Sequence, residues 1–371
     1  MHLRTLLMLS LISFGSTAQN LHLFVGTYTN SGSKGIYVYR FNVATGKATL
    51  ISNTDSAVNP SYLAISANQK FVYAVNETGR KNPGKVSSYS FNKNTGRLKF
   101  LNQQLSGGDD PCYVNVHKSN GWVLVGNYSG GSASVFAVNA DGSLKPYTQL
   151  MQDSGKGVNA SRQEKAHVHS TIFSPDQDYV FTPDLGLDKV MVYKFDAAAK
   201  RPLKPAIPSF VSTEPGSGPR HLAFHPNKKF CYLIEELTGT VSAYRYSNGK
   251  LTTFQRIATH PADFSGTIGS ADIHTSPDGR FLYASNRGDE NTITIFSINP
   301  ANGRLQLKGF QPTMGKTPRN FIIDPTGKYL LVANQETDNI VVFKRNIQTG
   351  LLTATGEQLK VPAPVCLQFM Q

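Results

Sequence analysis

Short hydrophobic runs separated by polar turns extend along nearly the whole chain. In one stretch, the runs Asp272–Thr275 and Phe281–Ala284 flank the polar turn Ser276–Arg280. A third run, Thr292–Phe296, leads through a tight turn to Leu305–Leu307. Runs of this length, bounded by Gly, Pro, Asn, Asp or Ser, predict β-strands. Alternation within the runs is imperfect, as expected for strands whose sheet is covered on both faces.

One small turn recurs between such runs at a steady interval. Its copies are Ala44–Lys47, Asn94–Arg97, Ala140–Ser143, Ser247–Lys250, Ala301–Arg304 and Gln348–Leu351. In each copy a Gly supplies the positive φ that a tight hairpin needs. If one further copy lies near Lys200-Arg201, the interval is about 51 residues and the chain contains seven units. Seven all-β units of this size predict a seven-bladed β-propeller with four antiparallel strands in each blade.

The two ends of the chain each supply part of a unit. Leu23–Thr27, Gly35–Tyr39 and Ala48–Leu50 predict three strands, and Pro364–Phe369 predicts the inner strand that they lack. Pairing both ends in one blade closes the ring and removes open sheet edges. We therefore expect residues 19–371 to form a single domain.

The first eighteen residues follow a different pattern. Arg4 precedes the apolar stretch Leu6–Phe14, and the small residues Ser16–Ala18 precede Gln19. This order is typical of a secretory signal peptide. The stretch is too short to span a bilayer of about 30 Å as a helix, and no nearby Cys follows that could carry a lipid anchor. We expect cleavage after Ala18 and export, most simply to the periplasm, without a membrane anchor.

The chain is basic, with a formal charge of +13 from 37 basic and 24 acidic residues. The charges are scattered, which indicates a general attraction for anions. No stripe of basic and aromatic residues suggests a nucleic-acid partner. Three cysteines, Cys112, Cys231 and Cys366, lie in apolar strand-like contexts that favour buried free thiols.

Aligning the units by their turns identifies the positions that face the central channel. The turns start at Ser66, His117, Ser174, His225, Ser276 and Asp324. Five residues earlier, at the entry to each inner strand, stand Ser61, Cys112, His169, Arg220, Ala271 and Arg319. Eleven residues after each turn start, at the end of each second strand, stand Glu77, Tyr128, Leu185, Glu236, Arg287 and Gln335. Because inner strands converge in a propeller, we expect the charged members of both sets to meet at one mouth of the channel.

The residue types at this mouth indicate capture of an anion and acid–base chemistry on it. We expect His169, Glu236 and Arg287 to be catalytic. We expect the substrate to be bound by Arg220, Arg319, His274, Glu77 and Tyr128.

Several of these segments together resemble a known family. Ala166–Ser170, Gly218–His221, Glu235–Leu237, Ala271–His274 and Thr317–Asn320 are similar to segments of the propeller-type 6-phosphogluconolactonases, which are related to the carboxy-muconate lactonizing enzymes. The resemblance covers about Leu21 to Phe369. It implies hydrolysis of a small anionic sugar lactone, such as 6-phosphogluconolactone, without a cofactor. It places the family's active-site His at His169, its arginines at Arg220 and Arg287, and its carboxylate at Glu236.

Three functions remain open at this point. In a lactone hydrolase, His169 or Glu236 activates water while the arginines hold the anionic group or stabilise the oxyanion. In a cycloisomerase, the same arginines hold carboxylates and a lactone ring closes. In a periplasmic propeller that binds carbohydrate or protein without catalysis, the channel residues serve only structure, since a fold does not fix a function.

The channel residues also bear on metal dependence. Glu77 and Glu236 stand against three arginines, which disfavours a divalent cation that needs several oxygen ligands. We therefore expect a chelator to leave the activity of the purified protein unchanged. Strong inhibition by the chelator, reversed by added Ca²⁺, would contradict this expectation.

Overall fold

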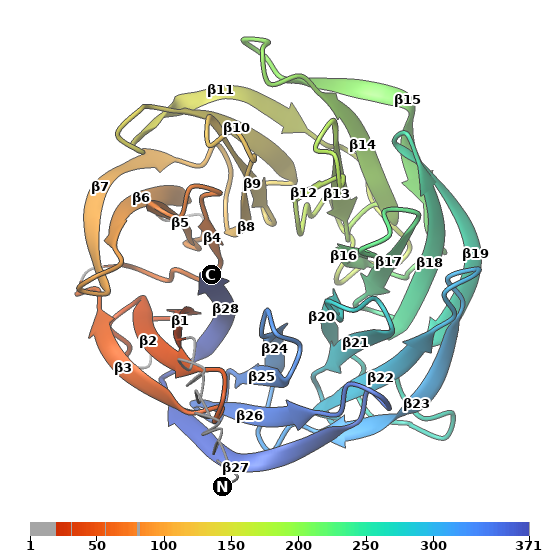
Figure 1. Cartoon of the computed structure of the whole chain (residues 1–371). Helices are drawn as coiled ribbons and strands as arrows, with labels where there is room; N and C mark the ends of the chain where they lie inside the picture. The colour runs from red at the N-terminus through yellow and green to blue at the C-terminus, as the bar shows by residue number, and fades with distance from the viewer. Residues whose placement is uncertain (1–19, 31, 56, 80–81, 371) are drawn as a thin grey trace, which may run out of the picture.

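The hydrophobic runs form β-strands, and the polar turns between them reverse the chain. In the computed structural model, which describes residues 20–30, 32–55, 57–79 and 82–370, the strands β1 to β28 form seven four-stranded antiparallel sheets. The sheets are arranged as blades around a central channel (Figure 1). The described residues contain no helix. The prediction of an all-β, seven-bladed propeller is confirmed.

Six blades consist of four consecutive strands and are numbered here along the chain. Blade 1 consists of β4 (Leu63–Ile65), β5 (Phe71–Asn76), β6 (Lys85–Asn92) and β7 (Arg97–Leu105). Blade 2 consists of β8 (Pro111–Val116), β9 (Trp122–Asn127), β10 (Ser132–Val138) and β11 (Leu144–Gln152). Blade 3 consists of β12 (Ile172–Phe173), β13 (Tyr179–Asp184), β14 (Lys189–Phe195) and β15 (Leu203–Ser212). Blade 4 consists of β16 (Pro219–Phe224), β17 (Phe230–Glu235), β18 (Thr240–Ser247) and β19 (Lys250–Ala258). Blade 5 consists of β20 (Ser270–Thr275), β21 (Phe281–Asn286), β22 (Thr292–Ile298) and β23 (Leu305–Pro312). Blade 6 consists of β24 (Pro318–Ile323), β25 (Tyr329–Asn334), β26 (Asn339–Arg345) and β27 (Leu352–Lys360).

The seventh, closing blade combines both ends of the chain. Its strand order is β28 (Pro364–Met370), β1 (Asn20–Thr27), β2 (Tyr37–Asn42) and β3 (Ala48–Asn53). The strands β1 and β28 pair antiparallel from His22–Met370 to Thr27–Pro364. As predicted, the C-terminal strand is the inner strand of a blade begun by the N-terminal strands.

The expected signal peptide at residues 1–18 lies outside the described residues. Within the described part of the chain, no helix has the length and hydrophobicity to cross a membrane.

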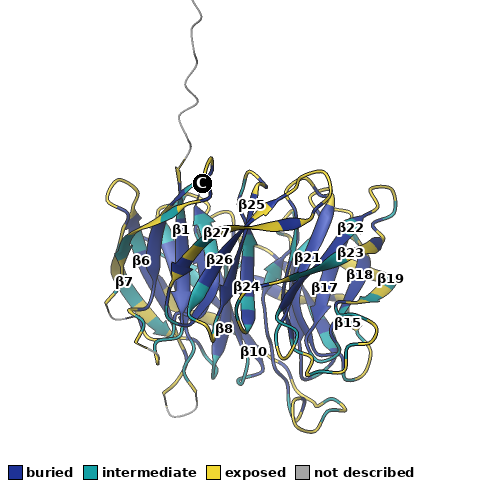
Figure 2. Cartoon of the chain, turned by 90° about the horizontal axis from the view of Figure 1, so that it is seen from below, coloured by how far each residue is buried: buried dark blue, intermediate teal, exposed yellow. Residues whose placement is uncertain are grey.

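The hydrophobic core lies between neighbouring blades. The second strands β17, β21 and β25 are buried at every position. The outermost strands are largely exposed, and in β7 no residue is fully buried. Figure 2 shows this gradient, with the dark blue strands inside and yellow residues on the outer strands and on loops at the ends of the blades. Sheets covered on both faces explain why the sequence alternation is imperfect.

The recurring hairpin Gly also joins neighbouring blades. In blade 2, Gly142 adopts a φ of 86°, and a Cβ added there would lie 2.2 Å from the ring of Phe71 in blade 1. In blade 6, Gly350 adopts a φ of 76°, and its Cβ would lie 2.3 Å from the ring of Phe281 in blade 5. Gly is thus required for the turn and for the close approach of the aromatic ring. The Gly that recurs in the sequence therefore marks the place where one blade packs against the next.

The hairpin of blade 3 has no such Gly. There the equivalent aromatic residue of blade 2, Trp122, donates a hydrogen bond from Nε1 to the carbonyl oxygen of Ala197 at 3.0 Å. This hairpin, in which none of the described residues has a positive φ, is the copy of the turn that is hidden in the sequence near Lys200-Arg201.

We expect Gly142→Ala to destabilise the protein by about 2–4 kcal/mol, because it combines backbone strain with overpacking against Phe71. The measurement is the free energy of unfolding in urea. Gly356→Ala is a matched control, since Gly356 has a φ of 84° and its added Cβ would meet no atom within 4 Å. A loss of stability equal in the two variants would show that the contact with Phe71 contributes nothing.

Candidate active site

Three inner strands begin with a Pro followed by a residue that lies outside the strand pairing. In blade 4, Pro219 pairs with Glu235 and His221 pairs with Ile234, which leaves Arg220 as the extra residue of a β-bulge. Cys112 follows Pro111 and Arg319 follows Pro318 in the same way. A bulge redirects a side chain, and Pro is tolerated at the first residue of a strand. The bulges explain how these three positions share one orientation toward the channel.

A second set of channel residues comes directly after the second strand of each blade. Its members are Tyr28, Glu77, Tyr128, Leu185, Glu236, Arg287 and Gln335. Six of them are the positions predicted from the turns. Tyr28 follows β1 and is the equivalent residue of the closing blade, where the sequence has no turn from which to count.

Members of both sets meet around one small cavity at the channel, which Arg220 reaches only through its bond to Glu236. Its volume is about 200 Å³, and its lining residues are Tyr28, Glu77, Cys112, Tyr128, Arg162, His169, Glu236, Arg287 and Arg319. These residues come from blades 1 to 6 and the closing blade. The convergence expected from the repeat is therefore observed for most of the predicted positions.

Glu236 is the centre of the charge network in this cavity. Its Oε1 accepts a hydrogen bond of 2.6 Å from Nη2 of Arg162, and its Oε2 accepts one of 3.0 Å from Nε of Arg220. Nη2 of Arg287 lies 3.0 Å from the same Oε2. Although burial alone raises the pKa of a carboxyl group, the guanidinium groups of Arg287, Arg220 and Arg162 hold the pKa of Glu236 well below its ordinary value. Glu236 is therefore a poor proton acceptor.

His169 is almost completely buried beside this carboxylate. Its Nε2 lies 3.8 Å from Oε2 of Glu236, and its Nδ1 lies 3.7 Å from Sγ of Cys112. The ring of Tyr128 stands edge-on at 5.3 Å. Burial, with the positive charge of Arg220, lowers the pKa of His169 well below its ordinary value. His169 is consequently a neutral imidazole at pH 7.

Arg319 is the guanidinium group with the fewest partners in the cavity. It forms no hydrogen bond with another described residue, lies 3.9 Å from Oε1 of Glu77 and stacks over the ring of Tyr28 at 5.6 Å. Tyr28 donates a hydrogen bond of 2.9 Å to Oε1 of Glu77. The other oxygen of Glu77, Oε2, is buried without a partner among the described residues. One cation donor and one carboxylate acceptor thus remain for a ligand.

His274 does not line this cavity. It lies further along β20 than the entry position, and its Nε2 bonds to Oδ2 of Asp272 at 2.9 Å. The other oxygen of Asp272, Oδ1, lies 2.8 Å from Nδ1 of His221. These three residues line a separate cavity of about 340 Å³. The expected placement of His274 at the channel mouth with Glu77, Tyr128 and Arg319 was wrong, because His274 lies further along its inner strand and lines the other cavity.

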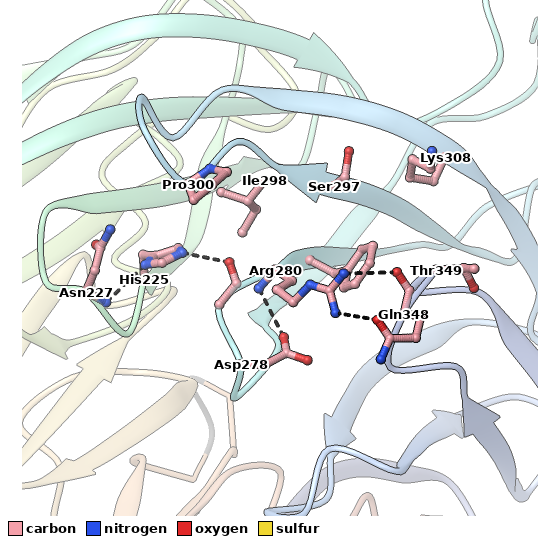
Figure 3. A pocket seen from close by; sticks show the side chains of 12 residues that line it. His225, Asn227, Asp278, Arg280, Ser297, Ile298, Pro300, Lys308, Gln348 and Thr349 are labelled. Carbon is pink, nitrogen blue, oxygen red and sulfur yellow. Dashed lines mark hydrogen bonds between the residues drawn. The ribbon is translucent and has the colours of Figure 1, made fainter.

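A larger cavity of about 770 Å³ lies away from the channel mouth, between blades 4, 5 and 6. Its polar groups bond to one another: Nε2 of His225 donates to the carbonyl oxygen of Gly279 at 2.8 Å, and Arg280 donates to Oε1 of Gln348 at 3.1 Å (Figure 3). These bonds join adjacent blades. The smaller cavity is therefore the candidate active site, since it holds the buried charges and the neutral imidazole.

Comparisons with known proteins agree with this geometry. Residues 22–369 match the family described as "Lactonase, 7-bladed beta-propeller". The chain belongs to this lactonase family. A relative from Formosa agariphila, named 6-phosphogluconolactonase, is 42% identical over 94% of this chain and 99% of its own length. A Bacillus subtilis protein of the same name is 39% identical over 94% of this chain and 97% of its own length.

A solved structure with the same fold is the periplasmic gluconolactonase PpgL of Pseudomonas aeruginosa. It is 40% identical to this lactonase-family chain and superposes with a TM-score of 0.90, covering 95% of this chain and 99% of its own.

Besides Tyr28, the sequence prediction missed Arg162 of the lactonase site. It comes from the connection between β11 and β12, outside the repeat, and its side chain is 43% exposed while it bonds to the buried Glu236. It also donates to the hydroxyl of Tyr128 at 3.3 Å. In the sequence, the only feature that pointed to this segment was the unusual length of the connection between β11 and β12.

We expect Glu236→Gln to lower the stability of this lactonase at pH 7 by about 3–5 kcal/mol, because it leaves buried guanidinium groups without their counter-charge. The lowered pKa of Glu236 means that its ionised form stabilises the fold above the ordinary carboxyl pKa of 4.5. The difference between wild type and variant should therefore shrink as the pH falls below that value. Urea unfolding at several pH values measures it.

Asp176→Asn is the control for the Glu236 variant, because Asp176 pairs with Lys228 on the exposed surface. It should leave stability unchanged. Equal stability of wild type and Glu236→Gln at neutral pH would contradict the view of Glu236 as the centre of the network.

Proposed function

We propose that this protein hydrolyses a sugar lactone that carries a negative charge, with 6-phosphogluconolactone as the leading substrate. The observation that carries the proposal is a neutral, buried imidazole beside a cavity rich in guanidinium groups. The names of the Formosa and Bacillus relatives, and of the Pseudomonas gluconolactonase, support lactone hydrolysis.

His169 is the general base in this proposal. Glu236 does not take that role here, because both of its oxygens are already held by arginines: Oε1 by Arg162, and Oε2 by Arg220 and Arg287. His169 takes a proton from water as the water oxygen attacks the lactone carbonyl carbon. Glu236 then lies 3.8 Å from Nε2 of the resulting imidazolium and stabilises its charge.

The arginines stabilise the negative charge that develops on the carbonyl oxygen. Arg287 and Arg162 line the cavity and are held in place by Glu236, so they are preorganised to accept this charge. Collapse of the tetrahedral intermediate breaks the bond between the carbonyl carbon and the ring oxygen. The imidazolium returns its proton to the departing ring oxygen, which leaves an open-chain hydroxy acid and neutral His169.

Substrate recognition follows from the excess of positive charge around the cavity. Arg162, Arg220, Arg287 and Arg319 exceed the two carboxylates of Glu77 and Glu236, which favours an anionic substrate. Arg319 binds the anionic group, since its guanidinium has no hydrogen-bond partner among the described residues. Oε2 of Glu77 accepts a hydrogen bond from a sugar hydroxyl.

Glu77 also separates this reaction from lactone formation by a cycloisomerase. A substrate with several carboxylates would bring a negative charge toward the unpartnered oxygen of Glu77. A hydroxylated sugar lactone supplies a donor there instead. This difference supports hydrolysis of a sugar lactone over the cycloisomerase alternative.

We further propose that residues 1–18 direct export of this lactonase. The similar Pseudomonas gluconolactonase is described as periplasmic, which supports this location. An exported enzyme would meet lactones formed outside the cytoplasm.

Hydrolysis is tested with purified protein, 6-phosphogluconolactone and gluconolactone, following acid release at pH 6.5 and subtracting spontaneous hydrolysis. His169→Ala should lower kcat about 10²- to 10⁴-fold, because it removes the base, while the melting temperature stays near that of wild type. Hydrolysis of neither lactone by wild type would overturn the proposal, as would full activity of the variant.

Arg319→Met tests recognition of the anionic group. It should raise KM for the phosphorylated lactone about 10- to 100-fold relative to the plain lactone, as expected for loss of a charge-assisted hydrogen bond. Arg280→Met, which alters an arginine in the other cavity, should change neither value. An equal effect of Arg319→Met on both lactones would contradict this role.

A further inference from the structure

The last residue of every second strand is a buried polar residue. These residues are Thr27, Asn76, Asn127, Asp184, Glu235, Asn286 and Asn334. In three blades the Asn donates a hydrogen bond to the carbonyl oxygen of the residue that follows the outer strand of the preceding blade. The three bonds are Asn127 to Ser106 at 3.3 Å, Asn286 to Thr259 at 2.7 Å and Asn334 to Thr313 at 3.1 Å. A neutral amide thus joins adjacent blades at this position.

Blade 3 departs from this pattern by placing two carboxyl groups at the joint. Asp184 stands where four other blades have Asn, and Asp153 follows β11 in the position of Ser106, Thr259 and Thr313. Asp153 is 8% exposed and Asp184 is fully buried. The two side chains are close enough for each to change the pKa of the other. The Oδ2 atom of each has no donor among the described residues.

Two carboxylate oxygens are both acceptors, so they can bond to each other only through a proton. A bound metal ion would be another way to hold them together. Among the described residues, however, no group of three His, Cys, Asp or Glu side chains could hold a metal ion.

We propose that Asp153 and Asp184 share one proton in a carboxyl–carboxylate hydrogen bond, and that this bond positions Arg162 and His169 in the active site. The positioning part rests on the proposed function, whereas the shared proton does not.

The pair lies at the base of the connection that carries Arg162. Asp153 begins this connection, and His167, at its other end, donates its backbone N–H to Oδ1 of Asp184 at 2.7 Å. Both ends of the connection therefore meet on Asp184. Within it, Nε2 of the buried Gln163 donates to Oδ1 of Asp188 at 2.8 Å. The adjacent Arg162 reaches Glu236 from this fixed base.

The same pair holds the segment that carries His169. Val168 forms a β-bridge with Asp184, and the backbone N–H of His169 donates to the carbonyl oxygen of Pro183 at 2.9 Å. His169 has little other strand pairing, because β12 of its blade begins only at Ile172. Loosening the Asp153–Asp184 bond would thus release Arg162 and His169 together.

The bond is sensitive to pH near neutrality. Burial raises the pKa of Asp153 to about 6 and that of Asp184 to about 7. The charged or titratable groups that face the pair are Lys189 and Tyr193 on β14; the ammonium of Lys189 lowers the pKa of Asp153, and the hydroxyl of Tyr193 lies 3.5 Å from Oδ1 of Asp153. The ring of His167 is turned away toward Glu164, at 3.2 Å.

The sign of the pH dependence follows from the raised pKa values. A carboxyl group that holds its proton more tightly in the folded protein stabilises the fold fully below its ordinary pKa of 3.8. That stabilisation is lost as the pH rises through about 6 to 7. Above this range two buried negative charges face each other, and the base of the connection opens.

Asp184→Asn tests the shared proton, because it introduces the amide found at this position in four other blades. The melting temperature of wild type should fall between pH 5.5 and 8, whereas that of Asp184→Asn should stay nearly constant over this range. Asp153→Asn should behave in the same way. Asp324→Asn is the matched control, since Asp324 is also fully buried but receives donors, including the backbone N–H of Tyr329 at 2.6 Å. It should keep the wild-type slope.

The positioning role is tested by the pH profile of lactone hydrolysis. For wild type, kcat/KM should fall at least about threefold between pH 7 and 8.5, and both Asn variants should remove this fall without loss of activity at pH 6.5. An unchanged profile in both variants would overturn the positioning role.

Two further outcomes would overturn the shared proton itself. One is a parallel pH dependence of the melting temperature in wild type and both variants. The other is a rise in the wild-type melting temperature with Ca²⁺ that Asp184→Asn abolishes, which would mean that a cation joins the pair. Melting needs no substrate, so a protein that hydrolyses no lactone would refute the proposed function while the melting curves still decide the shared proton.

Discussion

The pairing of β1 with β28 is the contact on which the rest of the structure depends. Each blade buries its two faces only against its neighbours, so an open ring would leave two apolar faces in water. The antiparallel pairing of six positions at each end of the chain closes that gap. Closure also fixes the site, because Tyr28 of the closing blade and Arg319 of blade 6 meet only in a complete ring.

Within this ring, the chemistry arises where blades depart from their common pattern. The equivalent of Glu236 is Leu185 in blade 3 and Gln335 in blade 6, and only Glu236 gathers three guanidinium groups. The buried joint that uses Asn in most blades uses two Asp residues beside the connection to His169. The residues that the blades share stabilise the fold, whereas the residues that differ between blades place charged groups at one side of the ring.

The repeated turn made the fold and much of the site predictable from the sequence. A fixed interval reveals the number of blades, and counting from the turns finds Glu77, Tyr128, His169, Glu236 and Arg287. Three features escaped this reasoning for physical reasons. Tyr28 lies in the blade that has no turn to count from, Arg162 lies in a connection outside the repeat, and His274 faces the channel at a greater depth. The β-bulges at Arg220 and Arg319 also leave no mark in the hydrophobic pattern.

The contact between most hairpin Gly residues and an aromatic ring of the preceding blade has a consequence for how such a molecule can change. These hairpins are fixed in length, since an inserted residue would displace the ring that the Gly touches. The connections from an outer strand to the next inner strand bear no such constraint, and one of them already supplies Arg162. New substrate preferences in this architecture should therefore arise by lengthening and reshaping those connections, and the hairpins should tolerate hardly any insertion.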